Sequence, residues 1–245
     1  MRSGLLCGLL LAQGCGMGPN TETLIQTVQV VSAINEPPEV APLEMWDLSL
    51  TVADPQGVEP EVLVWSCLED TCITGPVPLD ESGQGTTSLV SVAPIPVWVL
   101  ACDPSVCDLE NPTQEQLQDP FSWMAELPIE GVSLALQPVS ITEAPVEDRR
   151  KNPEITQQPE DEALQAATPD EPVMLEFMVP GASWAWGYST DGGFGRPSWD
   201  VASDGAVTLE WYAPEEGDSA EVYVVFIDEM GGQALWLASW NAASE

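Results

Sequence analysis

Short runs in which every second residue is apolar recur along this chain, and turn residues separate them. The two clearest runs are Trp46–Val52 and Val173–Val179. A period of two places alternate side chains on the same face of an extended strand, so each run predicts a β-strand with one buried face. Val222–Ile227 is apolar at every position, which predicts a strand in the middle of a sheet. The fold class expected from these patterns is all-β.

Other segments complete this prediction. Leu24–Ile34 is β-branched and apolar and is expected to form the first strand, and Asp54–Gly57 has the composition of a β-turn. Asp119 stands directly before Pro120, a pair that opens helices, so a short helix is expected over residues 119–126. Its side chains expected to face the sheet are Phe121, Met124 and Ala125.

The length of 245 residues is enough for two domains. The expected division is a leader over 1–14, a tether over 15–23, a first β-domain over 24–142, a linker over 143–152 and a second β-domain over 153–245. The linker holds Arg149, Arg150 and Lys151, three of the five basic residues. A dibasic protease site is one interpretation of them. The preferred one is an exposed linker whose positive charges offset two acidic domains.

The charge balance excludes several functions. The chain has 5 basic and 40 acidic residues, a net charge of −35, and it has no His. A nucleic-acid partner is not expected, because nothing would neutralise phosphates. The absence of His removes His-dependent catalytic triads and the commonest metal ligand. No cofactor and no metal are expected.

The first residues predict a compartment. One positive charge at Arg2 is followed by an apolar run from Leu5 to Ala12, the length of a signal-peptide core. The run ends in Gly14-Cys15, which resembles the lipobox of bacterial lipoproteins. That resemblance implies cleavage before Cys15, lipidation of its thiol, and, because Gly16 follows, an outer-membrane location. The alternative is an ordinary signal peptide that contains a Cys by chance.

A second resemblance concerns the body of the chain. The segments "NEPPEVAP", "LSLTVADPQG" and "VLVWSC", within residues 24–67, resemble the opening of Ig-like or PKD-like β-sandwich domains of bacterial surface lipoproteins. The resemblance returns more weakly in the second half. It implies two Ig-like β-sandwiches in tandem, with Trp65 in the core of a central strand. The family's function is uncharacterised, so the resemblance implies a fold and a location rather than an activity.

Four cysteines form two pairs with the same spacing. Cys67 and Cys72 follow one predicted strand, and Cys102 and Cys107 follow another. A zinc site is conceivable at this spacing, but an exported chain meets an oxidising compartment in which disulfides persist. The favoured pairing is local, Cys67–Cys72 and Cys102–Cys107, and a pairing between neighbouring strands stays open.

The densest aromatic region is the one candidate binding site in the sequence. It comprises Trp184, Trp186, Tyr188, Phe194 and Trp199. If three of these rings were exposed together, they would form a surface for a glycan or a peptide. Aromatic residues on strands are also common in cores, and that interpretation is preferred.

The sequence disfavours three other kinds of site. The Gly-rich segment 190–195 lacks the Lys and Ser/Thr of a phosphate loop. The acidic turns that contain Asp191, Asp200, Asp204, Asp228 and Glu229 lack the spacing of a calcium loop. Among 40 acids, two neighbouring carboxylates carry little information about catalysis.

The expected function is therefore a non-catalytic, lipid-anchored protein of the cell envelope with a display, adhesion or assembly role. Its expected partners are the membrane, through the lipid, and other envelope proteins or glycans. The alternative is a glycan- or peptide-binding module that uses the Trp184–Trp199 region, and an enzyme is the third hypothesis.

Overall fold

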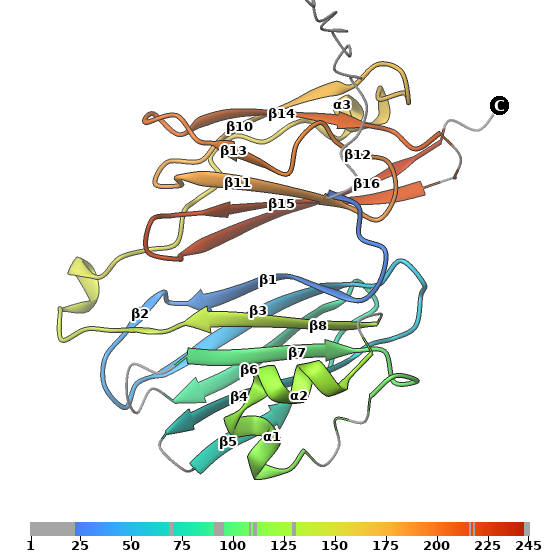
Figure 1. Cartoon of the computed structure of the whole chain (residues 1–245). Helices are drawn as coiled ribbons and strands as arrows, with labels where there is room; N and C mark the ends of the chain where they lie inside the picture. Colours follow the sequence, from blue (N-terminus) through green and yellow to red (C-terminus); the bar gives the residue numbers. More distant parts are fainter. Residues whose placement is uncertain are drawn as a thin grey trace, which may run out of the picture.

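The computed structural model describes residues 23–68, 71–90, 96–107, 109, 112–128, 131–215, 217 and 219–242. The predicted signal peptide, the lipobox with Cys15 and most of the tether lie outside these residues. Figure 1 shows two β-rich units, one above the other, joined on one side by the segment that follows Ile141.

The first unit is a sandwich of two antiparallel sheets. One sheet has the order β1-β3-β6, with bounds Gln29–Glu36, Met45–Ala53 and Gln84–Val90. The other has the order β5-β4-β7-β8, with bounds Thr71–Pro76, Glu61–Leu68, Pro96–Cys102 and Val132–Pro138. Two short strands, β2 (Glu39–Val40) and β9 (Ser140–Ile141), pair in parallel beside it. In Ig-like nomenclature this is the arrangement A-B-E against C′-C-F-G.

The second unit is also a sandwich of a three-stranded and a four-stranded antiparallel sheet. A sheet of order β10-β14-β12 (Val173–Met178, Ala206–Tyr212 and Gly193–Phe194) faces a sheet of order β13-β11-β15-β16 (Ser198–Asp200, Trp184–Ser189, Ser219–Ile227 and Gln233–Asn241). A short helix, α3 (Asp161–Gln165), contacts β10 and β16. The fold is all-β, with two Ig-like sandwiches in tandem.

The alternating runs form strands because each one buries a single apolar face. Trp46, Leu48, Leu50 and Val52 on β3 are at most 3% exposed and pack in the core of the first sandwich. In the second unit Leu175 and Phe177 on β10 are buried in the same way. The Asp54–Gly57 turn is also confirmed: the N–H of Gly57 donates to the carbonyl of Asp54 at 3.3 Å.

The prediction that Val222–Ile227 lies in a central strand is confirmed. This segment lies in β15, which pairs with β11 on one side and β16 on the other. Val222, Val224 and Phe226 point into the core of the second sandwich. Tyr223 and Val225 point out of the sandwich, where the first unit covers them.

Residues 23–28 depart from the predicted first strand. β1 begins at Gln29 rather than Leu24. Leu24 instead forms a parallel bridge with Ser189 of the second unit, and the N–H of Ile25 donates to the carbonyl of Ser189 at 2.8 Å. The start of the described chain therefore packs on the second sandwich before the chain enters the first.

Two short helices, α1 (Gln114–Gln118) and α2 (Pro120–Glu126), cover the outer face of the β5-β4-β7-β8 sheet. The helix at 119–126 is confirmed, but the prediction of its buried face is wrong. Trp123 is the buried residue, whereas Phe121 is 68% exposed and Ala125 is also exposed. The side chain of Met124 lies outside the described part.

Trp65 is buried as predicted, but not in the sandwich core. Val62 and Val64 on the same strand face the opposite sheet, so Leu63 and Trp65 point outward, beneath the helices. The indole Nε1–H of Trp65 donates to the carbonyl of Leu117 in α1 at 2.9 Å. The helices supply this face with a second apolar layer.

The two units meet across an apolar interface. A bulge in the pairing of β1 with β3 falls at Val31, which packs with Ile25, Ala53, Tyr223 and Val225. A bulged residue is turned out of the normal alternation, so it can serve a contact outside its own sheet. One side of the first sandwich thus rests on the outer face of the β11-β15-β16 sheet.

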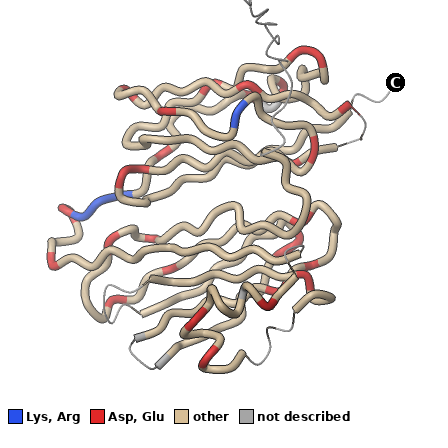
Figure 2. The backbone as a smooth tube through the Cα atoms, in the orientation of Figure 1, with Lys and Arg blue, Asp and Glu red and all other residues tan. Residues whose placement is uncertain are grey.

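The predicted linker also contributes to this junction. It contains the short helix η2 (Val146–Asp148), and the side chains of Arg149 and Arg150 are only 10% and 20% exposed. Arg149 pairs with Glu44, and Arg150 pairs with Glu39 and Asp228. The expectation of an exposed linker is wrong for these side chains, although their charges do offset carboxylates of both units. Figure 2 shows this basic segment between units whose other marked charges are mostly acidic.

Among the described residues, helices are too short and too polar to cross a membrane.

Candidate functional site

Strand β11 presents a row of aromatic rings on the outer face of the second sandwich. Trp184, Trp186 and Tyr188 occupy alternate positions, so their side chains share one face and successive positions are about 7 Å apart. Trp184 is 42% exposed and Trp186 is 39% exposed. Tyr188 is half-buried at the junction, and burial raises the pKa of its hydroxyl. Trp184 and Trp186 are the two most exposed of the ten Trp, all of which lie in the described part.

The other two rings of the predicted aromatic site point the other way. Trp199 is 4% exposed and Phe194 is fully buried, and both belong to the core of the second sandwich. They pack edge to face, with ring centres 5.7 Å apart. Arg196 covers the Trp199 ring at 5.2 Å. The inclusion of Trp199 as a binding residue is wrong, because its ring is buried. Two rings of the region are exposed, rather than the three on which a binding surface was conditional.

Phe194 also explains why the large side chains of β11 face outward. A Cβ atom on Gly187 would lie 2.7 Å from the Phe194 ring. The inward positions of β11 are the small residues Ala185, Gly187 and Ser189, which leave space for aromatic rings supplied by neighbouring strands. The Trp residues of this strand are consequently on the surface.

A small pocket opens beside Trp186, at the junction of the two units. Its volume is about 220 Å³. Trp186, Tyr188, Val225 and Ile227 line it from the second unit, and β1 and β8 line it from the first. Leu136 on β8 is 50% exposed at this pocket. We call Trp184, Trp186, Leu136 and this pocket the aromatic ledge.

Sequence reasoning missed the contribution of Leu136. Its alternation with Val132 and Leu134 suggested one buried face for the whole strand. The helices cover Leu134 but leave Leu136 exposed. The one signal in the sequence was that Leu136 is the last apolar residue of this alternating run. Whether the helices cover it depends on how they pack on the sheet.

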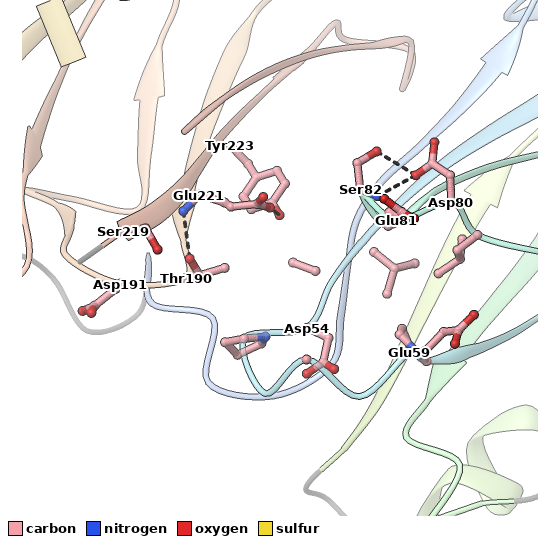
Figure 3. Close-up of a pocket in the computed structure, with 17 residues that line it drawn as sticks. Asp54, Glu59, Asp80, Glu81, Ser82, Thr190, Asp191, Ser219, Glu221 and Tyr223 are labelled. Carbon is pink, nitrogen blue, oxygen red and sulfur yellow. Dashed lines mark hydrogen bonds between the residues drawn. The ribbon is translucent and has the colours of Figure 1, made fainter. Parts of the chain in front are cut away.

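A second, larger cleft lies elsewhere along the junction. Its volume is about 950 Å³. Figure 3 shows carboxylates from both units around it: Asp54, Glu59, Asp80 and Glu81 from the first, and Asp191 and Glu221 from the second.

Two of these carboxylates accept hydrogen bonds from residues close to them in the sequence. Asp54 accepts the backbone N–H groups of Gln56 and Val58, and Asp80 accepts from Ser82 and Gln84. The hydrogen bond from the Ser82 hydroxyl is the main reason that the pKa of Asp80 lies below its usual value. These carboxylates stabilise turns.

Tyr223, which lines this cleft, also bonds within the protein. Burial is the main cause that raises the pKa of Tyr223, and its hydroxyl donates to Glu221. Within the described part of the chain, no group of three His, Cys, Asp or Glu residues could hold a metal ion.

The cysteines adopt the local pairing. Cys67 and Cys72 face each other across the β4–β5 hairpin, with Cα atoms 4.0 Å apart. Cys102 pairs with Cys107 in the loop after β7, with Cα atoms 6.2 Å apart. All four contribute to the apolar layer beneath α1 and α2. The disulfides therefore shape the side of the first unit that lies away from the aromatic ledge.

Comparison with known proteins adds little to this geometry. No protein-family model matches the chain, and no curated protein matches it. Among solved structures, the D0-D1 domain of intimin is 12% identical; the match covers 87% of this chain and 99% of that one, with a TM-score of 0.27. The Ig1-2 module of the Drosophila receptor protein tyrosine phosphatase DLAR is 13% identical, and the match covers 89% of this chain and 100% of that one, with a TM-score of 0.30. These scores are low, so the Ig-like description of this chain depends on its own strand order.

Proposed function

We propose that this protein is a non-catalytic interaction protein of the cell envelope, anchored by a lipid on Cys15, that presents the aromatic ledge to a partner. The observation that carries the proposal is the exposure of Trp184 and Trp186 side by side on β11. Large apolar side chains exposed together mark interaction surfaces, and Trp is enriched among the residues that dominate binding energy. The absence of His from the chain also removes the commonest general base.

The described chain begins near one end of β11, the strand that carries Trp184 and Trp186. The described chain starts at Thr23, whose hydroxyl accepts the N–H of Phe194, and Leu24 pairs with Ser189 at the end of β11. Trp184 is at the other end of that strand, about 17 Å away at 3.4 Å per residue. The eight residues after Cys15 that reach Thr23 span at most about 28 Å. A lipid on Cys15 would thus hold this end of the second sandwich within about 28 Å of the membrane.

The anchor is tested by membrane fractionation in a bacterial host that processes lipoproteins. We expect the wild type in the membrane fraction and Cys15→Ala in the soluble fraction. Cys7→Ala is the matched control, because Cys7 lies in the same apolar leader but precedes the predicted cleavage point. If Cys15→Ala stays in the membrane fraction as the wild type does, the lipid-anchor part of the proposal is wrong.

A further inference from the structure

The pocket of the aromatic ledge has room for one side chain rather than for a whole small molecule. Its volume of about 220 Å³ exceeds the roughly 150 Å³ that accommodates a benzene ring. It is smaller than the roughly 300–1,000 Å³ of typical small-molecule sites. The occupant is therefore expected to be one group that projects from a larger partner.

The lining of the pocket favours an apolar group over a sugar ring. Of the ten lining residues other than Trp186 and Tyr188, seven are apolar: Val30, Val31, Ala33, Ala135, Leu136, Val225 and Ile227. A sugar carries hydroxyl groups around its ring, and burying them without hydrogen-bond partners is costly.

The polar groups of the pocket wall have few free hydrogen-bond donors or acceptors for a sugar. Gln233 donates to Gln137 at 3.3 Å, and Gln137 donates to the carbonyl of Gly231 at 3.4 Å, so these amides already bond within the protein. Ser32 also lines the pocket, and its hydroxyl is buried without a partner among the described residues. One such hydroxyl cannot satisfy a sugar, whereas an aliphatic or aromatic side chain needs no hydrogen bond.

The charges around the ledge favour a cationic partner. Asp200 is exposed and is the register partner of Trp184 on β13. Arg149 and Arg150 form ion pairs and Arg196 covers Trp199, so among the described basic residues only Lys151 is both exposed and outside these contacts. The chain as a whole carries −35. A Lys or Arg over an indole gains a cation–π interaction, and complementary charge raises the association rate.

The same charges argue against a second copy of this chain as the occupant. Two copies would bring together two strongly negative surfaces. In the basic cluster that a copy could offer, residues 149–151, Arg149 and Arg150 are paired with carboxylates at the junction, which leaves one exposed cation, Lys151.

From these observations we infer that the aromatic ledge binds an extended, positively charged segment of another protein. One large apolar side chain of that segment enters the pocket beside Trp186, and a neighbouring Lys or Arg lies over Trp184 and next to Asp200. This inference rests on the proposed interaction function and names the class of its partner.

The test is a selection from a display library of random 12-residue peptides on the protein without its leader, with counter-selection on Trp186→Ala. We expect the enriched peptides to carry Lys or Arg next to a large apolar residue. Synthetic copies of them should bind Trp186→Ala and Leu136→Ala about tenfold or more weakly than the wild type. They should also bind Asp200→Asn more weakly, and added salt should weaken binding to the wild type.

Met174→Ala is the matched control, because Met174 is 51% exposed on β10, in the opposite sheet of the same sandwich. Its binding should equal that of the wild type. Thermal unfolding of each variant confirms that it is folded. Enriched peptides that lack basic residues, or that bind Trp186→Ala as tightly as the wild type, overturn the inference.

A glycan array probed with the same proteins separates the two levels of proposal. Glycan binding that disappears in Trp186→Ala would overturn the peptide inference but leave the proposed interaction function in place. If neither peptides nor glycans bind in a way that depends on Trp186, both proposals fail at this surface.

Discussion

Replacement of Arg150 is the sharpest test of how the two sandwiches are held together. Its Nη1 lies 3.0 and 2.9 Å from the two carboxylate oxygens of Asp228 in the second unit. Its Nε lies 3.4 Å from Glu39 in the first unit, and its backbone N–H donates to the same carboxylate at 3.0 Å. One side chain thus links both units, and Arg150→Ala removes that link.

The expected cost follows from the burial of the pair. Exposed ion pairs contribute about 0.2–1 kcal/mol, whereas removing one partner of a buried pair costs about 3–5 kcal/mol. The side chains of Arg150 and Asp228 are 20% and 12% exposed, between these limits. Asp228 also keeps two backbone donors, the N–H groups of Met230 and Gly232, each at 2.8 Å. We therefore expect Arg150→Ala to lower the free energy of unfolding by about 2 kcal/mol, or Tm by about 4–8 °C for a chain of this size.

The assay is thermal and urea unfolding of the wild type, Arg150→Ala and Lys151→Ala. Lys151 is exposed and adjacent, so its replacement makes the same change in net charge without breaking the link. A double-mutant cycle with Asp228→Asn should show a coupling energy of about 1 kcal/mol or more. The reasoning is refuted if Arg150→Ala is no less stable than Lys151→Ala, or if the cycle shows no coupling.

Three further predictions address other parts of the molecule. Trp65→Ala should lower the free energy of unfolding by about 3–5 kcal/mol, measured by urea unfolding, because it opens a cavity beneath the helices and removes the hydrogen bond to Leu117. Gly187→Ala should cost about 1–3 kcal/mol in the same assay, because the new methyl group meets the Phe194 ring at 2.7 Å. The N–H of Ala41 and then Arg149 hold the pKa of Glu44 below its usual 4.5, so Glu44 stabilises the fold above that pH and loses this effect as the pH falls through the lowered pKa. Glu44→Gln should therefore have a lower Tm than the wild type at neutral pH, and the difference should vanish in acid.

Each of these predictions has an internal comparison. Trp186→Ala should be far less destabilising than Trp65→Ala, because Trp186 is exposed. Gly75→Ala should be tolerated better than Gly187→Ala, because a Cβ at Gly75 has no atom within 4 Å. Equal costs within either pair would contradict the packing described here. A Tm difference for Glu44→Gln that does not shrink as the pH is lowered below 4.5 would contradict the assigned role of its carboxylate.

The fold class was predictable because strand formation depends on local sequence. The alternation at Trp46–Val52 and the doubly apolar run at Val222–Ile227 identified their strands, and the latter also showed that β15 is central. The spacing of the four cysteines favoured the local disulfides for a similar reason, since each pair closes a short loop.

Which face of a strand points inward was less predictable. On β4 both faces are apolar, so periodicity cannot say whether Val64 or Trp65 faces the opposite sheet. On β11 the larger residues point outward, because Phe194 occupies the space beside Gly187. In each case the answer depends on residues distant in the sequence.

The sequence by itself determined the strands, the acidic character and the candidate aromatic strand. The tertiary structure alone decided that Trp184 and Trp186 are exposed while Trp199 is buried, and that Leu136 joins them from the other unit. It also decided that Arg150 links the two sandwiches instead of lying in an open linker. The physical reason is that strand propensity is a property of neighbouring residues, whereas exposure is set by whatever packs on each face, here the helices, a core aromatic ring and the opposite sandwich.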